Sequence, residues 1–139
     1  LACAESCTGG WVSEVVTATA GSSQWFERGF VTYSNAAKQE LLGVKADTLR
    51  QEGAVSEAVV REMAAGALRR SHAQAALAIS GVAGPTGGSP GKPVGTVSFA
   101  WVLQGGEPTA ETLHFSGDRE AVRKQSVVYA LQGLLRMLD

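Results

Sequence analysis

Two short apolar runs constrain the fold of this 139-residue chain more than any other feature. They are LACAES at residues 1–6 and AALAIS at residues 75–80, and each has the length of a buried strand rather than of a helix. Both end abruptly, the first in CTGG and the second in GVAGPTGGSPGKP, which is the densest turn signal in the chain. We therefore expect two buried strands, each followed at once by a turn.

The segments between and after these runs alternate between strand-like and helix-like patterns. Further strands are expected within RGFVTYS (28–34), VGTVSFAWVLQ (94–104) and TAETLHFSG (109–117), where β-branched and aromatic residues concentrate. Helices are expected from residue 11 to a stop at Gly21, from Ser34 or Asn35 to a stop at Gly43, from Ser56 to about residue 71, and from Asp118 onward. The predicted order is β-α-β-α-α-β-β-β-α.

This order predicts an α/β fold. The early strands are separated by helices, as in parallel crossovers, whereas the last two are joined by GGEP, which is typical of a hairpin. We therefore expect a single domain over residues 1–139, built as a three-layer α/β/α sandwich with a mixed β-sheet.

Charge and hydropathy argue against several classes of partner. Lys and Arg number 12 and Asp and Glu 13, with no dense basic stripe, so no nucleic acid partner is expected. No apolar run approaches the length of a membrane span, and no signal peptide is present, so we expect no membrane partner. Hydrophobic residues make up 45% of the chain and charged residues 18%, which argues against disorder.

The two cysteines, Cys3 and Cys7, are expected to be free thiols. Four residues of extended strand separate them by about 13 Å, which is too far for a disulfide. No histidine or second cysteine pair lies near them, so no metal site is expected. Free thiols without an export signal favour the cytoplasm.

Three strand ends carry polar or reactive side chains: ESCTGG, TYSNAAK and ISGVAGPTGG. Sites in α/β sheets form beyond the carboxyl ends of the strands. Each of these ends also continues into glycines or a helix start, where backbone N–H groups can bind an anion without a basic residue. The sequence therefore places its candidate chemistry in these three segments.

Ser6 is a candidate nucleophile, and a nucleophilic serine needs a base. His72 lies in a polar turn and His114 in mid-strand, so a Ser-His-Asp triad has little support and a lysine base remains. Lys38 lies in the first turns of a helix, where the helix dipole lowers a lysine pKa, although a solvated surface lysine is the alternative. Tyr33 lies near a strand end, where its hydroxyl either relays a proton or simply packs.

Several stretches taken together resemble a known family. They are AESCTGG, GSSQWFERGFVTYSNAAKQELLGV, GAVSEAVVREMAAGAL, ISGVAGPTGGSPGKPVGTV and FSGDREAVRKQ. In this order, from residue 1 to about residue 131, the chain is similar to the nicotinamide mononucleotide amidohydrolases of the CinA C-terminal domain family. The resemblance implies hydrolysis of the carboxamide of nicotinamide mononucleotide to nicotinate mononucleotide and ammonia, in pyridine nucleotide (NAD) salvage, with no metal or organic cofactor.

The same resemblance implies roles for individual residues. Ser6 falls on the nucleophile, and Tyr33 and Lys38 fall on its partners, in a mechanism with an acyl-enzyme intermediate. The expected substrate-binding residues are Thr8, Gly9, Gly10, Ser23, Ser80, Gly81, Gly84 and Arg119. Among them, N–H groups of the turn after Ser6 would bind the oxyanion, and the glycines with Arg119 would bind the substrate phosphate. Glu5 is expected either to favour the cationic pyridinium ring or to orient Lys38.

Some expectations concern the whole chain. A homo-oligomer is expected, and family members usually carry a helix before the first strand, which this chain lacks. Two other functions remain open: a catalytically silent nucleotide-binding or interaction domain, and an enzyme with Cys7 as nucleophile. The second has little support because Cys7 has no histidine partner.

Overall fold

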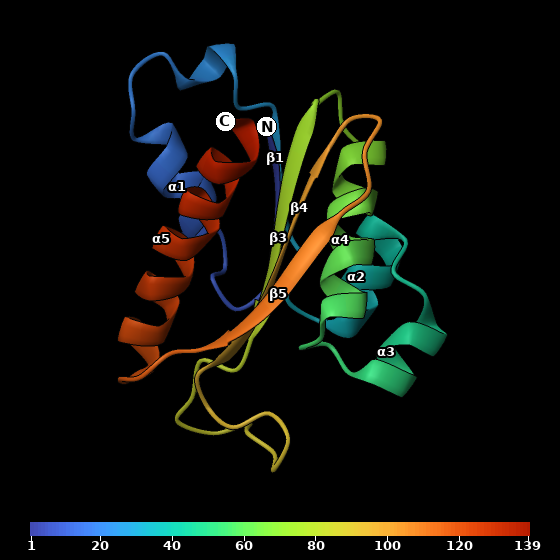
Figure 1. Ribbon diagram of the computed structural model, residues 1–139, viewed down its shortest axis with the longest axis vertical. Helices are drawn as coiled ribbons and strands as arrows, with labels where there is room; N and C mark the ends of the chain where they lie inside the picture. Colours follow the sequence, from blue (N-terminus) through green and yellow to red (C-terminus); the bar gives the residue numbers. More distant parts are fainter.

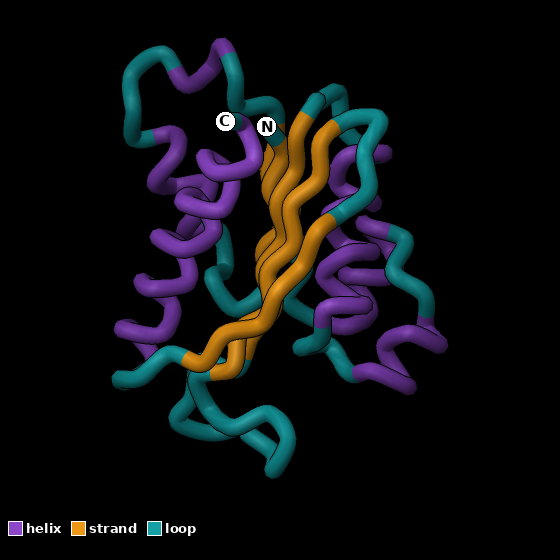
Figure 2. Tube along the Cα trace, viewed as in Figure 1, coloured by secondary structure: helices purple, strands orange, loops and turns teal.

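A five-stranded mixed sheet forms the centre of the molecule, and the computed structural model describes residues 1–139 (Figures 1 and 2). The strands lie in the order β2-β1-β3-β4-β5. β1 pairs in parallel with β2 and β3, whereas β4 is antiparallel to both β3 and β5. The strands are β1 (Ala2–Glu5), β2 (Arg28–Val31), β3 (Ala75–Gly81), β4 (Thr96–Leu103) and β5 (Thr109–His114).

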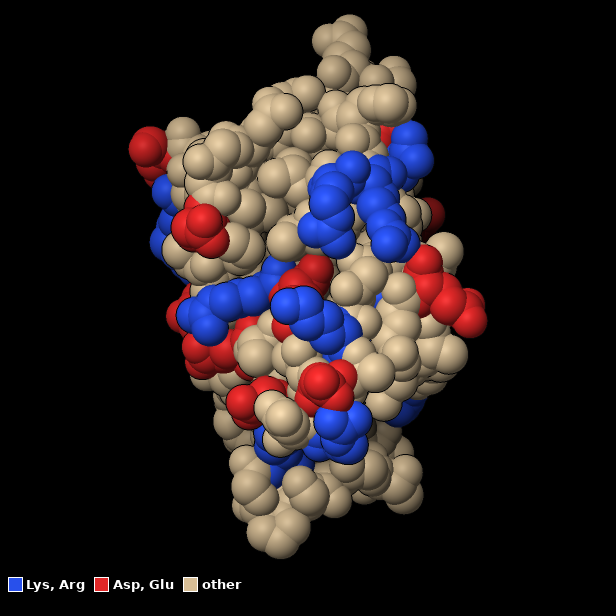
Figure 3. Space-filling view, turned by 90° about the vertical axis from the view of Figure 1, so that its right-hand side faces the viewer, with Lys and Arg blue, Asp and Glu red and all other residues tan.

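Helices cover both faces of this sheet, so the predicted α/β/α sandwich is confirmed (Figure 1). One face carries α1 (Trp11–Thr17) and α5 (Arg119–Leu138). The other carries α2 (Asn35–Leu42), α3 (Ala46–Glu52) and α4 (Glu57–Arg69). None of the helices combines the length and hydropathy needed to cross a bilayer. On the α2–α4 side, Lys and Arg are interspersed with Asp and Glu (Figure 3).

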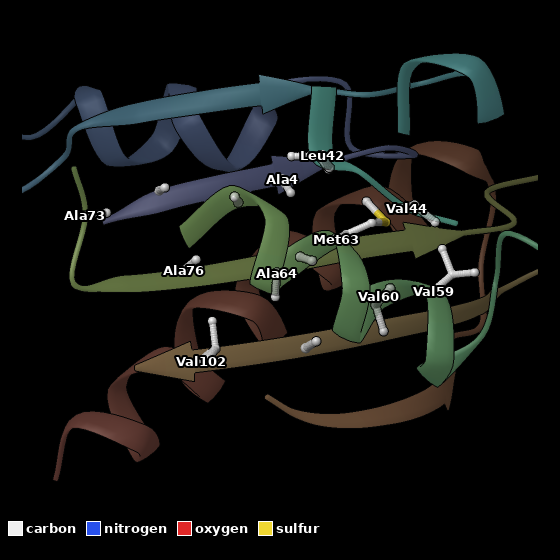
Figure 4. Packing of buried hydrophobic residues seen from close by; sticks show 14 of the residues in the cluster. Ala4, Leu42, Val44, Val59, Val60, Met63, Ala64, Ala73, Ala76 and Val102 are labelled. Atoms are coloured by element: carbon white, nitrogen blue, oxygen red, sulfur yellow. The ribbon is translucent and has the colours of Figure 1, made fainter. Parts of the chain in front are cut away.

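Alternation along the strands divides the buried residues into two cores. In β1 and β3, alanines such as Ala4 and Ala76 face α4, whose Met63 and Ala64 pack against them (Figure 4). These small side chains let α4 lie close to the sheet. On the opposite face, larger side chains such as Phe99 pack beneath α5. The three central strands β1, β3 and β4 are thus covered on both faces, as their near-continuous apolar sequences require, whereas the edge strands β2 and β5 are partly exposed.

Side chains cap the helices at three of the predicted starts. Ser34 accepts a hydrogen bond from the N–H of Ala37, Ser56 from that of Val59, and Asp118 from that of Ala121. Each bond satisfies a donor that the first turn leaves free. At the other end of α2, Gly43 adopts a φ of 72°, as predicted for a glycine stop.

Two element predictions were wrong. The helix expected to reach Gly21 ends at Thr17, and Gly21, at a φ of 87°, instead precedes a 3-10 turn over Ser22–Gln24 (η1). The helix α3 was not predicted, because Leu49 is its only buried residue and no side chain caps its start. A helix with one apolar contact has no periodic pattern to detect.

The strand directions bring four chain segments to one edge of the sheet, which we call the carboxyl edge. It lies at the bottom of Figure 1, away from both termini. β1, β2, β3 and β5 all end there and β4 begins there. The segments that follow these strands, 6–10, 32–34, 82–95 and 115–118, therefore converge, as expected for a site in an α/β sheet.

Candidate active site

Ser6 and Lys38 meet at the carboxyl edge. Ser6 directly follows β1, whose pairing continues through the bond from the Ser6 N–H to the Ile79 carbonyl. Lys38 lies on α2, and its Nζ is 3.0 Å from the Ser6 Oγ. Lys38 is 1% exposed and Ser6 7% exposed, so the contact is almost sealed from bulk water. The alternative of a solvated surface lysine is therefore wrong.

Two backbone carbonyls complete the surroundings of the Lys38 amine. Its Nζ donates to the Thr32 carbonyl at 3.0 Å and to the Tyr33 carbonyl at 3.2 Å. Carbonyl oxygens only accept, so when the amine is unprotonated its two N–H groups can both be bound by these carbonyls, which leaves the lone pair available to accept the Ser6 proton. Burial lowers the pKa of Lys38. The pKa is therefore shifted in the predicted direction, with burial as the main cause.

The turn from Ser6 to Gly10 presents backbone donors beside the nucleophile. The Gly9 N–H donates to the Ser6 carbonyl, but the N–H groups of Cys7, Thr8 and Gly10 donate to no backbone carbonyl. Gly9 and Gly10 have φ values of 60° and 106°, which side chains disfavour. The turn therefore carries free donors of the kind an oxyanion requires.

Glu5 has a role that differs from both expectations. Its carboxylate is fully buried and accepts four hydrogen bonds: from the Thr8 hydroxyl, the Val12 N–H, and the N–H and hydroxyl of Ser13. All of these donors belong to the turn and to the first residues of α1. Glu5 therefore anchors the start of α1, and no hydrogen bond joins it to Lys38.

Tyr33 and Arg119 meet at the mouth of the site. The Arg119 Nη2 donates to the Tyr33 hydroxyl at 3.2 Å, and its Nη1 donates to the Gly84 carbonyl at 2.8 Å. The Tyr33 side chain is exposed, whereas its carbonyl lies 3.5 Å from the Ser6 Oγ. Tyr33 thus contacts the Ser6–Lys38 pair through its backbone, and its proton-relay role stays a prediction.

Two further predicted residues lie on β3 beside the nucleophile. Ser80 is 2% exposed and follows Ile79, whose carbonyl accepts the Ser6 N–H. At Gly81, an added Cβ would lie 2.8 Å from a Val97 methyl and 3.1 Å from the Cys7 Sγ. Gly81 therefore serves close packing behind the turn. Gly84, with a φ of 84°, is buried and directly precedes the exposed part of the loop.

Ser23 is a correction. It lies exposed on η1, near Leu1 and Ala73 at the opposite edge of the sheet, because α1 runs back along the strands and carries the chain away from Ser6. The two histidines are also uninvolved: the His114 Nε2 is 2.8 Å from the Val94 carbonyl, and the His72 N–H donates to Glu27. No group of three or more His, Cys, Asp or Glu residues is placed to hold a metal ion.

Arg123 is a site residue that sequence reasoning missed. Its Nε donates to the Cys7 carbonyl at 3.0 Å and its Nη2 to the Thr8 carbonyl at 3.1 Å. The guanidinium lies 5.2 Å above the Trp11 ring. With Arg119, these residues border a hollow of about 510 Å³. The one available signal in the sequence was the spacing of Arg119 and Arg123, because residues four apart lie on the same face of a predicted helix.

Comparison with known proteins gives one family. The model of the CinA C-terminal domain matches residues 1–138. The chain is 62% identical over 131 residues to nicotinamide-nucleotide amidohydrolase PncC of Escherichia coli K12, which covers 94% of this chain and 79% of that protein. It is 56% identical over 134 residues to the protein of that name from Pseudomonas putida, covering 96% and 83%.

Solved structures agree with these matches. The competence/damage inducible protein CihA from Agrobacterium tumefaciens superposes with a TM-score of 0.97 at 43% identity, covering 99% of this chain and 84% of that one. The competence damage-inducible protein A from Klebsiella pneumoniae gives a TM-score of 0.94 at 44% identity, with the same coverage. The architecture described above is therefore shared with crystallographically determined proteins.

Proposed function

Because the chain belongs to the CinA C-terminal domain family, we propose that it is a nicotinamide-nucleotide amidohydrolase. Its reaction would hydrolyse the carboxamide of nicotinamide mononucleotide to nicotinate mononucleotide and ammonia, in NAD salvage. Relatives of 56–62% identity that are known as nicotinamide-nucleotide amidohydrolases support the activity. The observation that carries the chemistry is the 3.0 Å contact between the buried Lys38 amine and the Ser6 hydroxyl.

The first half of the reaction forms an acyl-enzyme. The neutral Lys38 amine accepts the Ser6 proton while the Ser6 Oγ bonds to the carboxamide carbon, and the carbonyl oxygen becomes an oxyanion. We assign stabilisation of this charge to the N–H groups of the turn after Ser6 that donate to no backbone carbonyl. The Lys38 ammonium then gives its proton to the amide nitrogen, the C–N bond breaks, and ammonia leaves.

The second half restores the enzyme. A water molecule loses a proton to Lys38 and bonds to the acyl carbon, and the second tetrahedral intermediate collapses with return of that proton to the Ser6 Oγ. The products are the nicotinate group and free Ser6. One water is consumed for each ammonia released, and the proposal assigns no step to a metal or organic cofactor.

Substrate binding is assigned to the other segments of the carboxyl edge. The phosphate is negative and suits Arg119 together with the glycine-rich backbone after Ser80. Arg119 is already held in place by the Gly84 carbonyl and the Tyr33 hydroxyl. We assign Ser80 to the wall of the pocket beside Ser6. Action in the cytoplasm and as a homo-oligomer remain predictions.

The test is ammonia release from nicotinamide mononucleotide by Ser6→Ala and Lys38→Met variants. Each should lower kcat by at least about 1,000-fold, because each removes one half of a coupled pair. Lys124→Met, which changes an exposed lysine on α5, is the matched control and should retain activity. Full activity in the Ser6 or the Lys38 variant would contradict the catalytic role of that residue. Wild-type protein that binds the nucleotide without turning it over would instead favour a catalytically silent binding domain.

Tyr33→Phe separates two roles for the tyrosine hydroxyl. Because that hydroxyl accepts from Arg119, its loss should raise KM while leaving kcat within about threefold. A large fall in kcat at unchanged KM would instead support the proton relay. Steady-state kinetics on the same substrate makes the distinction.

A further inference from the structure

The turn after Ser6 is held from two sides. On the sheet side, the buried Glu5 carboxylate accepts a hydrogen bond from the Thr8 hydroxyl. On the α5 side, Arg123 donates through two nitrogens to two successive carbonyls, those of Cys7 and Thr8. Gly9 and Gly10 directly follow the anchored residues, and both have positive φ, where glycine leaves the backbone the most freedom to rearrange. A turn of this composition needs external contacts to keep one conformation.

The two Arg123 bonds also set where the turn's donors point. In a planar trans peptide, the carbonyl and the N–H point in opposite directions. The Cys7 carbonyl is bound by Arg123, so the Thr8 N–H of the same peptide is directed away from that guanidinium. The Thr8 N–H is one of the groups that donate to no backbone carbonyl. Arg123 therefore orients a free donor beside the nucleophile.

We propose that Arg123 is a positioning residue that holds the oxyanion-binding turn of Cys7 and Thr8 in its active conformation. The proposal rests on the proposed amidohydrolase function. Arginine suits this task because its planar guanidinium presents parallel donors, and the Trp11 ring, 5.2 Å away, fixes its plane. A lysine at this position would carry the same charge but could not bind two successive carbonyls in the same geometry.

An alternative role is binding of the substrate phosphate, since Arg119 and Arg123 border the same hollow. The geometry points away from it, because the Arg123 Nε and Nη2 are already engaged by carbonyls. The two roles have different kinetic signatures. Orientation of an oxyanion donor acts on the transition state and changes kcat, whereas a phosphate contact acts on substrate binding and changes KM.

The experiment compares Arg123→Gln and Arg123→Lys with wild type and with Lys124→Gln, which removes a charge from an exposed position of the same helix. Ammonia release from nicotinamide mononucleotide should show kcat lowered about 10–100-fold in both Arg123 variants, with KM within about threefold. The lysine variant should not rescue the rate, and the control should match wild type. All proteins are compared at a temperature where their unfolding curves show them folded.

A second readout keeps the inference separate from the proposed substrate. Phosphonylation of Ser6 by a fluorophosphonate probe also passes through a species with developing charge on oxygen, and it should be at least about tenfold slower in both Arg123 variants. Wild-type protein that reacts with the probe but releases no ammonia would contradict the proposed function alone. A raised KM with kcat retained, or unchanged labelling and kcat, would overturn the role of Arg123.

Discussion

The Lys38 side chain holds its basic amine at a position that bulk water hardly reaches. It is 1% exposed, and its amine contacts a hydroxyl and two carbonyls, none of which carries a formal charge. Losing hydration without gaining a negative partner disfavours the ammonium form, which is why burial lowers the pKa of Lys38. At the scale of the residue, the surroundings of Lys38 favour the neutral amine over the ammonium form.

This lowered pKa predicts the pH dependence of the reaction. A lysine base must be unprotonated, so kcat/KM should rise with pH and level off above the pKa of Lys38, below the value of about 10.4 for a free lysine. Rates measured between pH 6 and 10 should show one such rising limb. A limb that persists unchanged up to the free lysine value would contradict the assignment.

The same group predicts how stability responds to pH. Between the lowered folded pKa and the ordinary unfolded one, the unfolded chain binds more protons, so the free energy of unfolding rises with pH. Below both values the destabilisation from burying the charge is fully present. Urea unfolding should be measured for wild type and Lys38→Met across this pH window. The free energy of unfolding of wild type should rise relative to that of the variant as the pH rises. A difference that stays constant with pH would contradict the assignment.

The helix α1 depends on a residue outside itself. It has seven residues, and its N-cap, Gly10, offers no side chain to the first turn. The Glu5 carboxylate caps the helix instead: it accepts hydrogen bonds from the backbone N–H groups of Val12 and Ser13, at the positive end of the helix dipole. A strand residue thus provides the cap, and the position of α1 is tied directly to the sheet.

Glu5→Gln should destabilise the fold by about 2 kcal/mol or more, because an amide replaces two acceptor oxygens with one and turns two N–H donors toward other donors. Urea unfolding measures the loss. Glu107→Gln, on an exposed loop, is the matched control and should change stability by less than about 0.5 kcal/mol. Equal stability of the two variants would show that the carboxylate does not anchor α1.

The helices α2 and α4 touch at a glycine. A Cβ added to Gly66 of α4 would overlap the carbonyl oxygen of Leu42, the last residue of α2. Gly66→Ala should therefore push the two helices apart, lowering stability by about 1–3 kcal/mol and displacing Lys38 with α2. Unfolding curves and ammonia release measure both effects. Gly91→Ala, where a Cβ meets nothing within 4 Å, should alter neither.

Local signals predicted the elements best. The caps at Ser34, Ser56 and Asp118 were found because each bonds to a residue three positions on, so their chemistry is visible in a short window. The helix α3 escaped detection because Leu49 is its only buried residue. The end of α1 was misplaced because the apolar spacing continues beyond the point where the backbone leaves the helix.

At the scale of the whole molecule, both thiols report on global unfolding. Cys3 and Cys7 are free and buried, and burial raises the pKa of both, that of Cys7 to about 11. The thiolate is the reactive form, so at pH 8 neither should react with a disulfide reagent in the folded protein. Titration with the reagent should detect no rapidly reacting thiol in buffer and two in urea. Rapid reaction of one thiol in buffer would reopen Cys7 as a nucleophile.

The site's dependence on distant segments limited what the sequence predicted. The strand ends that carry Ser6 and Lys38 were predicted to form a site because parallel strands end at one edge, a rule that needs only element order. The pairing of Ser6 with Lys38 came from the family resemblance. Arg123 was missed because its contact with Cys7 spans 116 positions and exists only once α5 docks. Ser23 was assigned to the substrate site from the family resemblance alone, and no pattern in the sequence shows that α1 returns along the strands and carries Ser23 away from Ser6.

The ties between Lys38 and the carbonyls of Thr32 and Tyr33 have an evolutionary consequence. Every amino acid has a carbonyl, so substitutions at positions 32 and 33 leave these two anchors of the amine in place as long as the strand keeps its path. Selection on catalysis therefore acts weakly on those two side chains through Lys38, and strongly on the spacing between the end of β2 and the lysine. Distant relatives should be sought by that spacing rather than by the residues within it.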